Sequence, residues 1–219
     1  MGNILIVGEH LDGKIKKVTQ ELVSKAAELG QALGGEVDVA LIGSSIQGAE
    51  ELGIYGAKRV FVVPTPEKYN SEGYAKVIQA LADEIKPSVI LGTASPMGKD
   101  LFPHIAARLK AGLATDCTDL KIDGGKLLAT RPVFAGKGFM DVKFETPIQL
   151  ATARPNSFIT KPVIEGAKAE VVAKSIDPGA LRAVMKEIVK GKSDKVDLTE
   201  ASIIVSGGRA MKAAENFKI

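Results

Sequence analysis

Short aliphatic runs alternate with helix-periodic segments through the first half of the chain. The strand-like runs lie at 4–7, 37–42, 59–63 and 88–91, and the segments between them carry apolar residues at spacings of three and four. These segments predict helices at 18–29, 50–52 and 74–85, and a further one from about Asp100 to Leu109. Strands and helices that alternate in this way build a parallel sheet with helices on both faces. We therefore predict an α/β fold with a three-layer, Rossmann-like and mostly parallel sheet.

From Asp116 onward the pattern changes to consecutive strands. Strand-like segments lie at 117–122, 127–134, 139–145 and 147–153, and glycine or proline turns separate them. Such a series predicts an antiparallel or mixed extension of the sheet. A strand at 169–173 follows, and Asp177-Pro178 then predicts the start of a helix that runs to Val189.

Composition excludes several classes of function. The 29 Lys and Arg against 26 Asp and Glu give a net charge of only +3, which supplies no basic stripe for nucleic acid. The single cysteine and two histidines make a disulfide impossible within the chain and a metal centre improbable. Neither a signal peptide nor an apolar run long enough for a membrane span is visible. We expect a cytoplasmic protein without membrane insertion.

Two glycine loops follow strands and precede helices, where phosphates often bind. The stretch from Gly8 to Lys14 nearly spells a phosphate loop, but Ile15 stands where Ser or Thr would hold Mg²⁺, so a tight strand-to-helix turn is favoured. In the stretch from Gly92 to Lys99, backbone N–H groups and the helix dipole could hold an anion or a partner's loop. The alternative for Gly92 to Lys99 is a plain connection whose glycines serve geometry alone.

No catalytic residue is predicted. His104 lies among apolar neighbours in a helix, without a Ser, Cys or carboxylate at a useful spacing. Cys117 has no visible base beside it, which indicates a buried strand thiol. Asp116 and Asp119 border a strand, where solvated edge charges account for them.

The last segment restarts a strand–turn–helix unit. A strand at 202–205 leads into the turn Ser206, Gly207, Gly208 and Arg209. The glycines let a backbone approach a ligand and the arginine offers a planar charged donor fork, which suits a phosphate or an electron-rich ring. A glycine turn with a solvent-exposed arginine is the alternative reading. A lone strand and half a helix cannot bury their faces, so they either dock on the first domain or begin a second domain that the chain does not complete. We favour the second account, with domains at 1–192 and 193–219.

The closing block LTEASIIVSGGRAMKAAENFKI strongly resembles the entry to the flavin domain of the electron-transferring flavoprotein α subunit family. The blocks ILIVGEHLDGK, GKDLFPHIAARLKAGLATDCTDL, RPVFAGK and RPNSF resemble the N-terminal domain of the same family, in the same order. The resemblance implies an FAD-containing heterodimer with a β subunit. It also implies that Arg209 contacts FAD and that Ser206, Gly207 and Gly208 shape the turn. Ala210 stands where glycine is common in the family. Most other flavin contacts would follow Ile219, so FAD binding by this chain alone should be weak or absent.

The resemblance implies an electron carrier rather than an enzyme with its own substrate. Its redox partners would be acyl-CoA or other dehydrogenases and a quinone oxidoreductase. One alternative is a stand-alone regulatory module that binds an adenine nucleotide at the Gly92 to Lys99 loop and forms a homodimer. A third reading, a hydrolase that uses His104 or Cys117, has the least support because neither residue has a visible catalytic partner.

Overall fold

The computed structural model describes residues 2–65, 69–183, 186 and 203–217. The chain divides into two compact units, Met1–Glu187 and Ile188–Ile219. Within the described residues, no helix is both long and apolar enough to cross a membrane.

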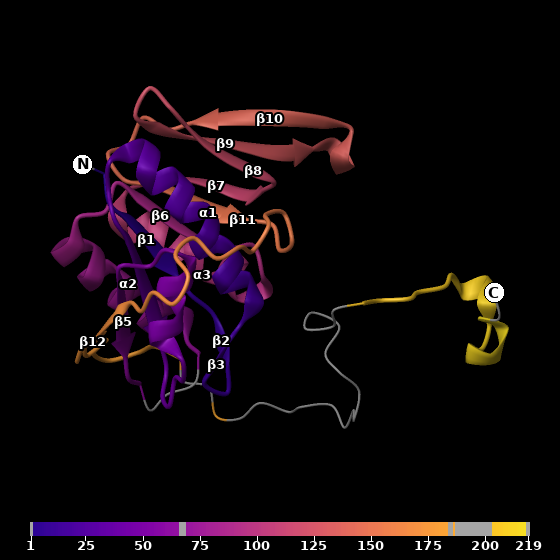
Figure 1. Ribbon diagram of the computed structural model, residues 1–219, viewed down its shortest axis with the longest axis horizontal. Helices are drawn as coiled ribbons and strands as arrows, with labels where there is room; N and C mark the ends of the chain where they lie inside the picture. The colour runs from indigo at the N-terminus through magenta and orange to yellow at the C-terminus, as the bar shows by residue number, and fades with distance from the viewer. Residues whose placement is uncertain (1, 66–68, 184–185, 187–202, 218–219) are drawn as a thin grey trace. The chain divides into compact units, whose positions relative to one another are not determined.

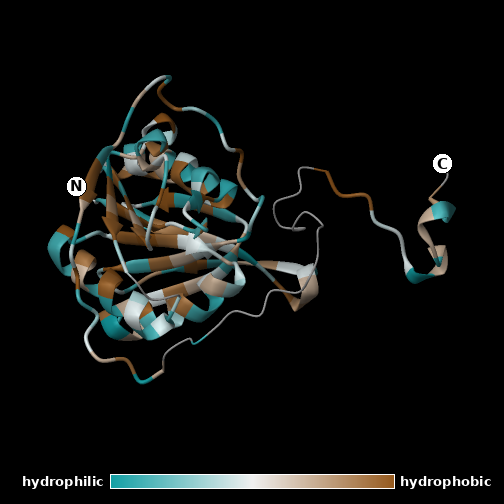
Figure 2. Ribbon diagram, turned by 90° about the horizontal axis from the view of Figure 1, so that it is seen from below, coloured by the Kyte–Doolittle hydropathy of each residue, from teal (hydrophilic) through white to brown (hydrophobic). Residues whose placement is uncertain are grey.

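The first unit is built on a seven-stranded sheet in the order β12-β5-β4-β1-β6-β11-β7 (Figure 1). Every neighbouring pair in this sheet is parallel. The strands are β1 Ile4–Val7, β4 Val37–Ile42, β5 Arg59–Val63, β6 Val89–Thr93, β7 Gly112–Cys117, β11 Gln149–Ala153 and β12 Glu170–Ala173. Figure 2 shows the central strands as largely hydrophobic, as expected for strands covered on both faces.

Alternate residues of the strands point to opposite layers. In β1, Ile4 and Ile6 pack with α1 (Lys17–Leu33) and the 3₁₀ helix η1 (Ala49–Tyr55), whereas Leu5 and Val7 pack with α2 (Ser71–Ile85) and α3 (Pro96–Leu109). Helices therefore cover both faces of the sheet. The predicted α/β class and the three layers are confirmed, and each predicted element from 4 to 91 has its counterpart in the structure.

The second half of the chain divides between two sheets. β8 (Asp119–Asp123), β9 (Lys126–Val133) and β10 (Gly138–Lys143) form a separate three-stranded antiparallel sheet, with the short turn η2 (Phe134–Gly136) between β9 and β10. This small sheet packs on the α1 side of the core through Leu120, Leu127 and Ala129. Two details differ from the expectation. β11 joins the central sheet in parallel, and the segment 117–122 is split because Cys117 ends β7 while Asp119 begins β8.

A long connection carries the chain from β11 across α1 to β12 at the opposite edge of the sheet. The buried carboxylate of Glu21 accepts hydrogen bonds from the backbone N–H groups of Asn156 and Phe158, at 3.0 and 2.8 Å. The carbonyl of Ile54 then accepts the N–H of Val163 at 2.8 Å. These contacts supply hydrogen-bond partners to backbone N–H groups that lie outside regular secondary structure.

The helix expected from Asp177 to Val189 is wrong over 177–183, where the described backbone is not helical. The side chains of Asn70, the N-cap residue of α2, and of Lys76 within α2 donate to the carbonyls of Ala183 and Ala180, which a continuing helix would have used internally. Of the remaining positions, all except Lys186 lie outside the described residues.

The second unit is described at 203–217 and contains two short 3₁₀ turns, η3 (Arg209–Met211) and η4 (Ala214–Asn216). The predicted strand begins at Ser202, outside the described residues, and 203–205 are not assigned to a strand. A strand requires a neighbour for its backbone hydrogen bonds, and the described part of this unit offers none. The helix expected after the turn is likewise replaced by η3 and η4.

Candidate functional site

The turn at 206–209 presents its polar groups to solvent. Ser206, Gly207, Gly208 and Arg209 are all exposed, and Arg209 opens η3 directly after Gly208. A Cβ atom at Gly207 would lie 2.5 Å from the Phe217 ring and 2.7 Å from the Met211 side chain. A side chain at Gly207 would thus collide with these two residues. The turn therefore combines accessible backbone with a permanently charged guanidinium, which can bind an oxyanion or stack on a planar ring.

Three exposed apolar residues precede this turn. Ile203, Ile204 and Val205 have exposed fractions of 85, 57 and 75%. Three consecutive aliphatic side chains of this kind are typical of a buried strand rather than of a surface loop. In the described part of the second unit, these three side chains are not buried against other apolar groups.

The first unit has a second candidate position, at the switch point of its sheet. The chain runs from β1 outward through β4 to β5, and then returns to place β6 on the other side of β1. In open α/β sheets, ligands bind where the strand order reverses, beyond the carboxyl ends of the strands. Here those ends lead into Gly8 and Glu9 after β1, and into Ala94 and Ser95 after β6.

Glu9 fills this position with a carboxylate of the chain itself. Its side chain is only 4% exposed; Oε1 accepts a hydrogen bond from Ser95 Oγ at 2.5 Å, and Oε2 lies 3.5 Å from Lys16 Nζ. Ser95 is the N-cap of α3 and accepts the N–H of Gly98 at 3.0 Å. The first turn of α3, where an anionic ligand would be stabilised, therefore already has a negative charge beside it.

The two glycine loops of the sequence have structural roles around Glu9. Between Gly8 and Lys14 the chain forms a small hairpin, β2 (His10–Leu11) with β3 (Lys14–Ile15), and not a direct strand-to-helix turn. In the other loop, a Cβ at Gly98 would lie 1.8 Å from the carbonyl oxygen of Thr93, so this glycine permits close packing of α3 on β6. That helix starts at Pro96, earlier than the expected Asp100.

Glu9 and Ser95 are not among the residues predicted from the sequence. A signal for Ser95 was present, because Ser followed by Pro is a common N-cap and first-turn pair. Glu9 carried no such signal, since its partner Ser95 is distant in sequence and is brought near only by the pairing of β1 with β6.

The two histidines have no catalytic arrangement. His10 Nδ1 accepts the N–H of Gly13 at 3.4 Å, which leaves Nε2 to donate to the carbonyl of Ile42 at 2.9 Å. His10 therefore joins the β2–β3 hairpin to the end of β4. His104 is exposed on α3. Across the described residues, no group of three or more His, Cys, Asp or Glu could hold a metal ion.

Cys117 is fully buried at the end of β7, and its burial raises the pKa of the thiol to about 11, against an opposing influence from Arg131. Its thiolate fraction at pH 8 is then about 0.1%, compared with about a quarter for a model thiol of pKa 8.5. We expect iodoacetamide to alkylate Cys117 at least about 100-fold more slowly in the native chain than in guanidinium chloride at the same pH. Mass spectrometry of timed samples measures both rates. Rates within threefold of each other would show an accessible, reactive thiol.

The two aspartates around Cys117 are ion-paired. Arg154 donates to both carboxylate oxygens of Asp116, with Nε–Oδ1 at 3.0 Å and Nη2–Oδ2 at 2.7 Å, and this interaction lowers the pKa of Asp116. Asp119 lies 2.7 Å from Lys121 Nζ. Both carboxylates therefore have cationic partners, as expected for charges at a sheet edge.

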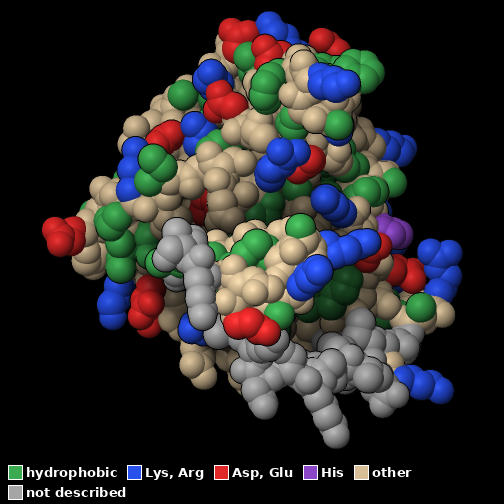
Figure 3. All heavy atoms as spheres, turned by 90° about the vertical axis from the view of Figure 1, so that its right-hand side faces the viewer, with side chains coloured by type: hydrophobic (Ala, Val, Ile, Leu, Met, Phe, Trp, Pro, Cys, Tyr) green, Lys and Arg blue, Asp and Glu red, His purple; other side chains and the backbone are tan. Residues whose placement is uncertain are grey.

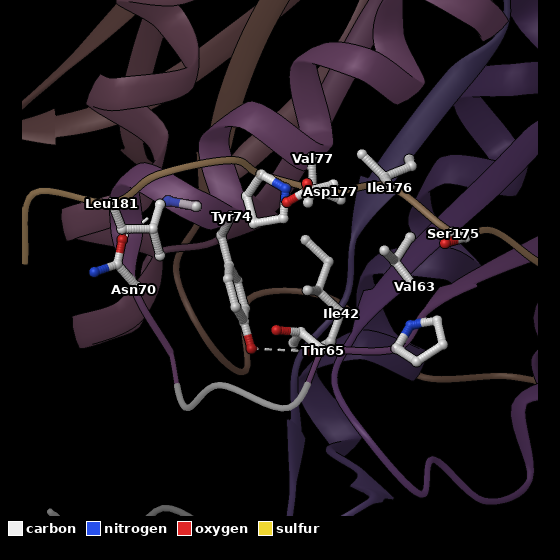
Figure 4. A pocket seen from close by; sticks show the side chains of 13 residues that line it. Ile42, Val63, Thr65, Asn70, Tyr74, Val77, Ser175, Ile176, Asp177 and Leu181 are labelled. Atoms are coloured by element: carbon white, nitrogen blue, oxygen red, sulfur yellow. Dashed lines mark hydrogen bonds between the residues drawn. The ribbon is translucent and has the colours of Figure 1, made fainter. Parts of the chain in front are cut away.

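Two cavities of the first unit lie beside α2 and beside α1. One of about 190 Å³ is bounded by the ends of β4 and β5, the start of α2 and residues 175–181 (Figure 4). Tyr74 projects into this region, and its hydroxyl donates to the carbonyl of Ile42 at 3.1 Å. A shallower groove of about 420 Å³ lies beside the carboxyl end of α1. On the face in Figure 3, basic and acidic side chains are intermixed, without a single-sign stripe.

Comparison with known proteins gives a consistent result. The family model described as "Electron transfer flavoprotein domain" matches residues 4–178. The chain is 38% identical to "Protein FixB" of Clostridium saccharobutylicum, over 99% of this chain and 66% of that protein, and 35% identical to "Electron transfer flavoprotein subunit alpha" of Bacillus subtilis, over 98% and 66%. It is also 34% identical to "Lactate dehydrogenase (NAD(+),ferredoxin) subunit LctC" of Acetobacterium woodii, over 98% of this chain and 53% of that protein. The chain spans about two thirds of the length of the first two relatives, and it belongs to the electron transfer flavoprotein family.

Proposed function

We propose that this chain is the N-terminal domain of an electron transfer flavoprotein α subunit, together with the first segment of its FAD domain at 193–219. The observation that carries the proposal is the exposed Ser206–Arg209 turn in a chain that aligns over 98% of its length with an α subunit. The intact protein would be an FAD-containing heterodimer with a β subunit. It would carry electrons from acyl-CoA or other dehydrogenases to a quinone oxidoreductase or another acceptor.

The residues of the turn fit an FAD contact. Arg209 offers five N–H donors on a planar cation, which suits a phosphate group or a ring that gains negative charge on reduction. The exposed Gly208 allows close backbone approach. Bound FAD would accept and release the electrons, while the protein sets its position and surroundings. One or two charge-assisted hydrogen bonds contribute about 1.5 to 3 kcal/mol each, so tight binding requires contacts beyond this turn.

The first unit would serve as a scaffold and a partner for the β subunit. The β9–β10 hairpin supports this role, because Phe134 and Phe139 are 81 and 69% exposed and Met140 is 44% exposed. Exposed large apolar side chains on a projecting hairpin, whose backbone is seen in Figure 1, are typical of protein interfaces. The occupied switch point at Glu9 weighs against the alternative of a stand-alone adenine-nucleotide module.

We place the protein among electron carriers rather than enzymes with their own substrates. Cys117 is buried with a raised thiol pKa, His10 bonds to backbone groups, and the exposed arginine turn suits a cofactor. One relative is named as a subunit of a lactate dehydrogenase in A. woodii, so a dehydrogenase of that kind is a second candidate electron donor.

The test is to express the uninterrupted α gene together with its neighbouring β-like gene, with the 219-residue chain as control. A yellow heterodimer with one FAD, beside a colourless 219-residue chain, is the expected result, read from the visible spectrum and the native mass. Calorimetric titration of the 219-residue chain with ADP is expected to show no binding. A colourless complex, or a stable homodimer of the 219-residue chain that binds ADP, would favour the nucleotide-binding module.

A further inference from the structure

Residues 175–183 lie along the start of α2 as an extended segment. The pairing of β12 with β5 ends where the N–H of Lys174 donates to the carbonyl of Val62 at 2.9 Å. From Ser175 to Ala183 the chain has no regular secondary structure. We call this segment the strap. It is the last continuous stretch of the first unit that the structure describes, and the next continuous stretch begins at Ile203.

Polar side chains on the first turns of α2 hold the strap. Asn70 Nδ2 donates to the carbonyl of Ala183 at 2.6 Å, and Lys76 Nζ donates to the carbonyl of Ala180 at 2.9 Å. The carboxylate of Glu72 accepts the backbone N–H of Arg182 at 3.2 Å and its Nε at 3.4 Å. Most of these bonds reach the backbone of the strap. They hold it at a defined place on α2 without dense side-chain packing.

Apolar packing beneath the strap is incomplete. Leu181 lies close over Gly73, where a Cβ would be 3.4 Å from both of its methyl groups, and Ile176 packs partly against the core. The cavity of about 190 Å³ remains between the strap and Tyr74, as Figure 4 shows. Because side chains leave this space unfilled, the strap loses little packing when it leaves. Its attachment therefore depends mainly on exposed hydrogen bonds and ion pairs, which are individually weak.

We propose that the strap is a releasable anchor, bound to α2 in one state and free in another. When it is bound, the connection to the second unit starts after Ala183; when it is released, the connection starts at Ser175. Nine further residues extend the reach of that connection by about 30 Å at most. This role rests on the proposed function, because the group whose range it sets is the flavin turn at 206–209. The anchoring itself is independent of any flavin.

Trypsin cleavage after Arg182 measures release. The test variant is Glu72→Ala with Lys76→Ala, which removes both charged anchors. The matched control is Glu145→Ala with Lys126→Ala, an exposed pair of the same residue types in which the lysine also donates to a backbone carbonyl, that of Phe144. Cleavage after the exposed Lys137 serves as the internal reference in every sample. Fragments are quantified by mass spectrometry, and circular dichroism checks that each variant is folded.

The anchor variant is expected to be cut after Arg182 about tenfold faster than the unmodified chain, and the control variant at an unchanged rate, because proteolysis follows the population of the open form. Raising the salt from about 20 to 500 mM should accelerate this cut in the unmodified chain but not in the anchor variant, since salt screens exposed charges. Equal cleavage after Arg182 in all three folded proteins would overturn the anchor, and so would a salt effect that persists in the anchor variant. The assay contains no flavin or partner, so its failure is separate from failure of the proposed function.

Discussion

Leucine in place of Arg59 is expected to lower the free energy of unfolding by about 3 to 5 kcal/mol, because it leaves a buried carboxylate without its partner. Asp38 in β4 is 0% exposed and accepts from Arg59 Nε at 2.8 Å and from Nη2 at 2.7 Å. The pair joins β4 to β5, where Asp38 and Arg59 lie opposite each other. Urea denaturation followed by circular dichroism measures the change.

A second arginine–aspartate pair supplies the control. Arg154 makes the same two-bond contact with Asp116, but that carboxylate side chain is 33% exposed, so Arg154→Leu should cost no more than about 1 kcal/mol. Changing Asp38 and Arg59 together to leucine should recover most of the loss, because no buried charge then remains. Equal costs for Arg59→Leu and Arg154→Leu would show that water reaches Asp38.

Alanine at Arg209 is expected to raise the FAD dissociation constant of the intact flavoprotein by about 10- to 100-fold, which corresponds to 1.5 to 3 kcal/mol for a charge-assisted contact. Fluorescence titration of the apoprotein with FAD measures the constant. Arg209→Lys should retain little of the affinity, because a point charge does not reproduce the planar donor fork.

Lys212→Ala is the matched control for Arg209, since Lys212 is an exposed cation three residues away. Its removal should change the FAD dissociation constant less than about twofold if only general electrostatic attraction is lost. Equal weakening by Arg209→Ala and Lys212→Ala would assign the flavin contact to other residues.

The first half of the fold was predictable because its signals are local. The strands β1, β4, β5 and β6 and the helices α1 and α2 show their period within single segments, and their order alone indicates a parallel sheet. The start of α3 was placed late because Pro96 and Gly98 suggested a loop, although Ser95 and Pro96 form an N-cap and first-turn pair.

Partner choice between strands was not predictable in the same way. The segment that forms β11 has the same alternation whether it pairs with the preceding hairpin or returns to β6, and only the packing of the whole sheet selects β6. The helix expected at Asp177 had a correct local start signal, but side chains on α2, more than one hundred residues earlier, take its backbone groups.

The candidate site shows the same difference between residues with a local sequence signal and residues without one. The Ser206–Arg209 turn was visible because its residue types are contiguous, and its role as an FAD contact stays a prediction. Glu9 at the switch point was not visible, since its meaning depends on Ser95 and Lys16 being assembled around it.

The edge strand β12 also constrains the order of events during synthesis. It is the last strand of the central sheet to leave the ribosome, and it pairs with β5, which was made about 110 residues earlier. The strands from β1 to β11 can associate first, while the edge of β5 stays unpaired until β12 has been made. The chain thus completes its sheet only late in translation, so a nascent chain stalled before Glu170 would expose an unpaired, aggregation-prone β5 edge.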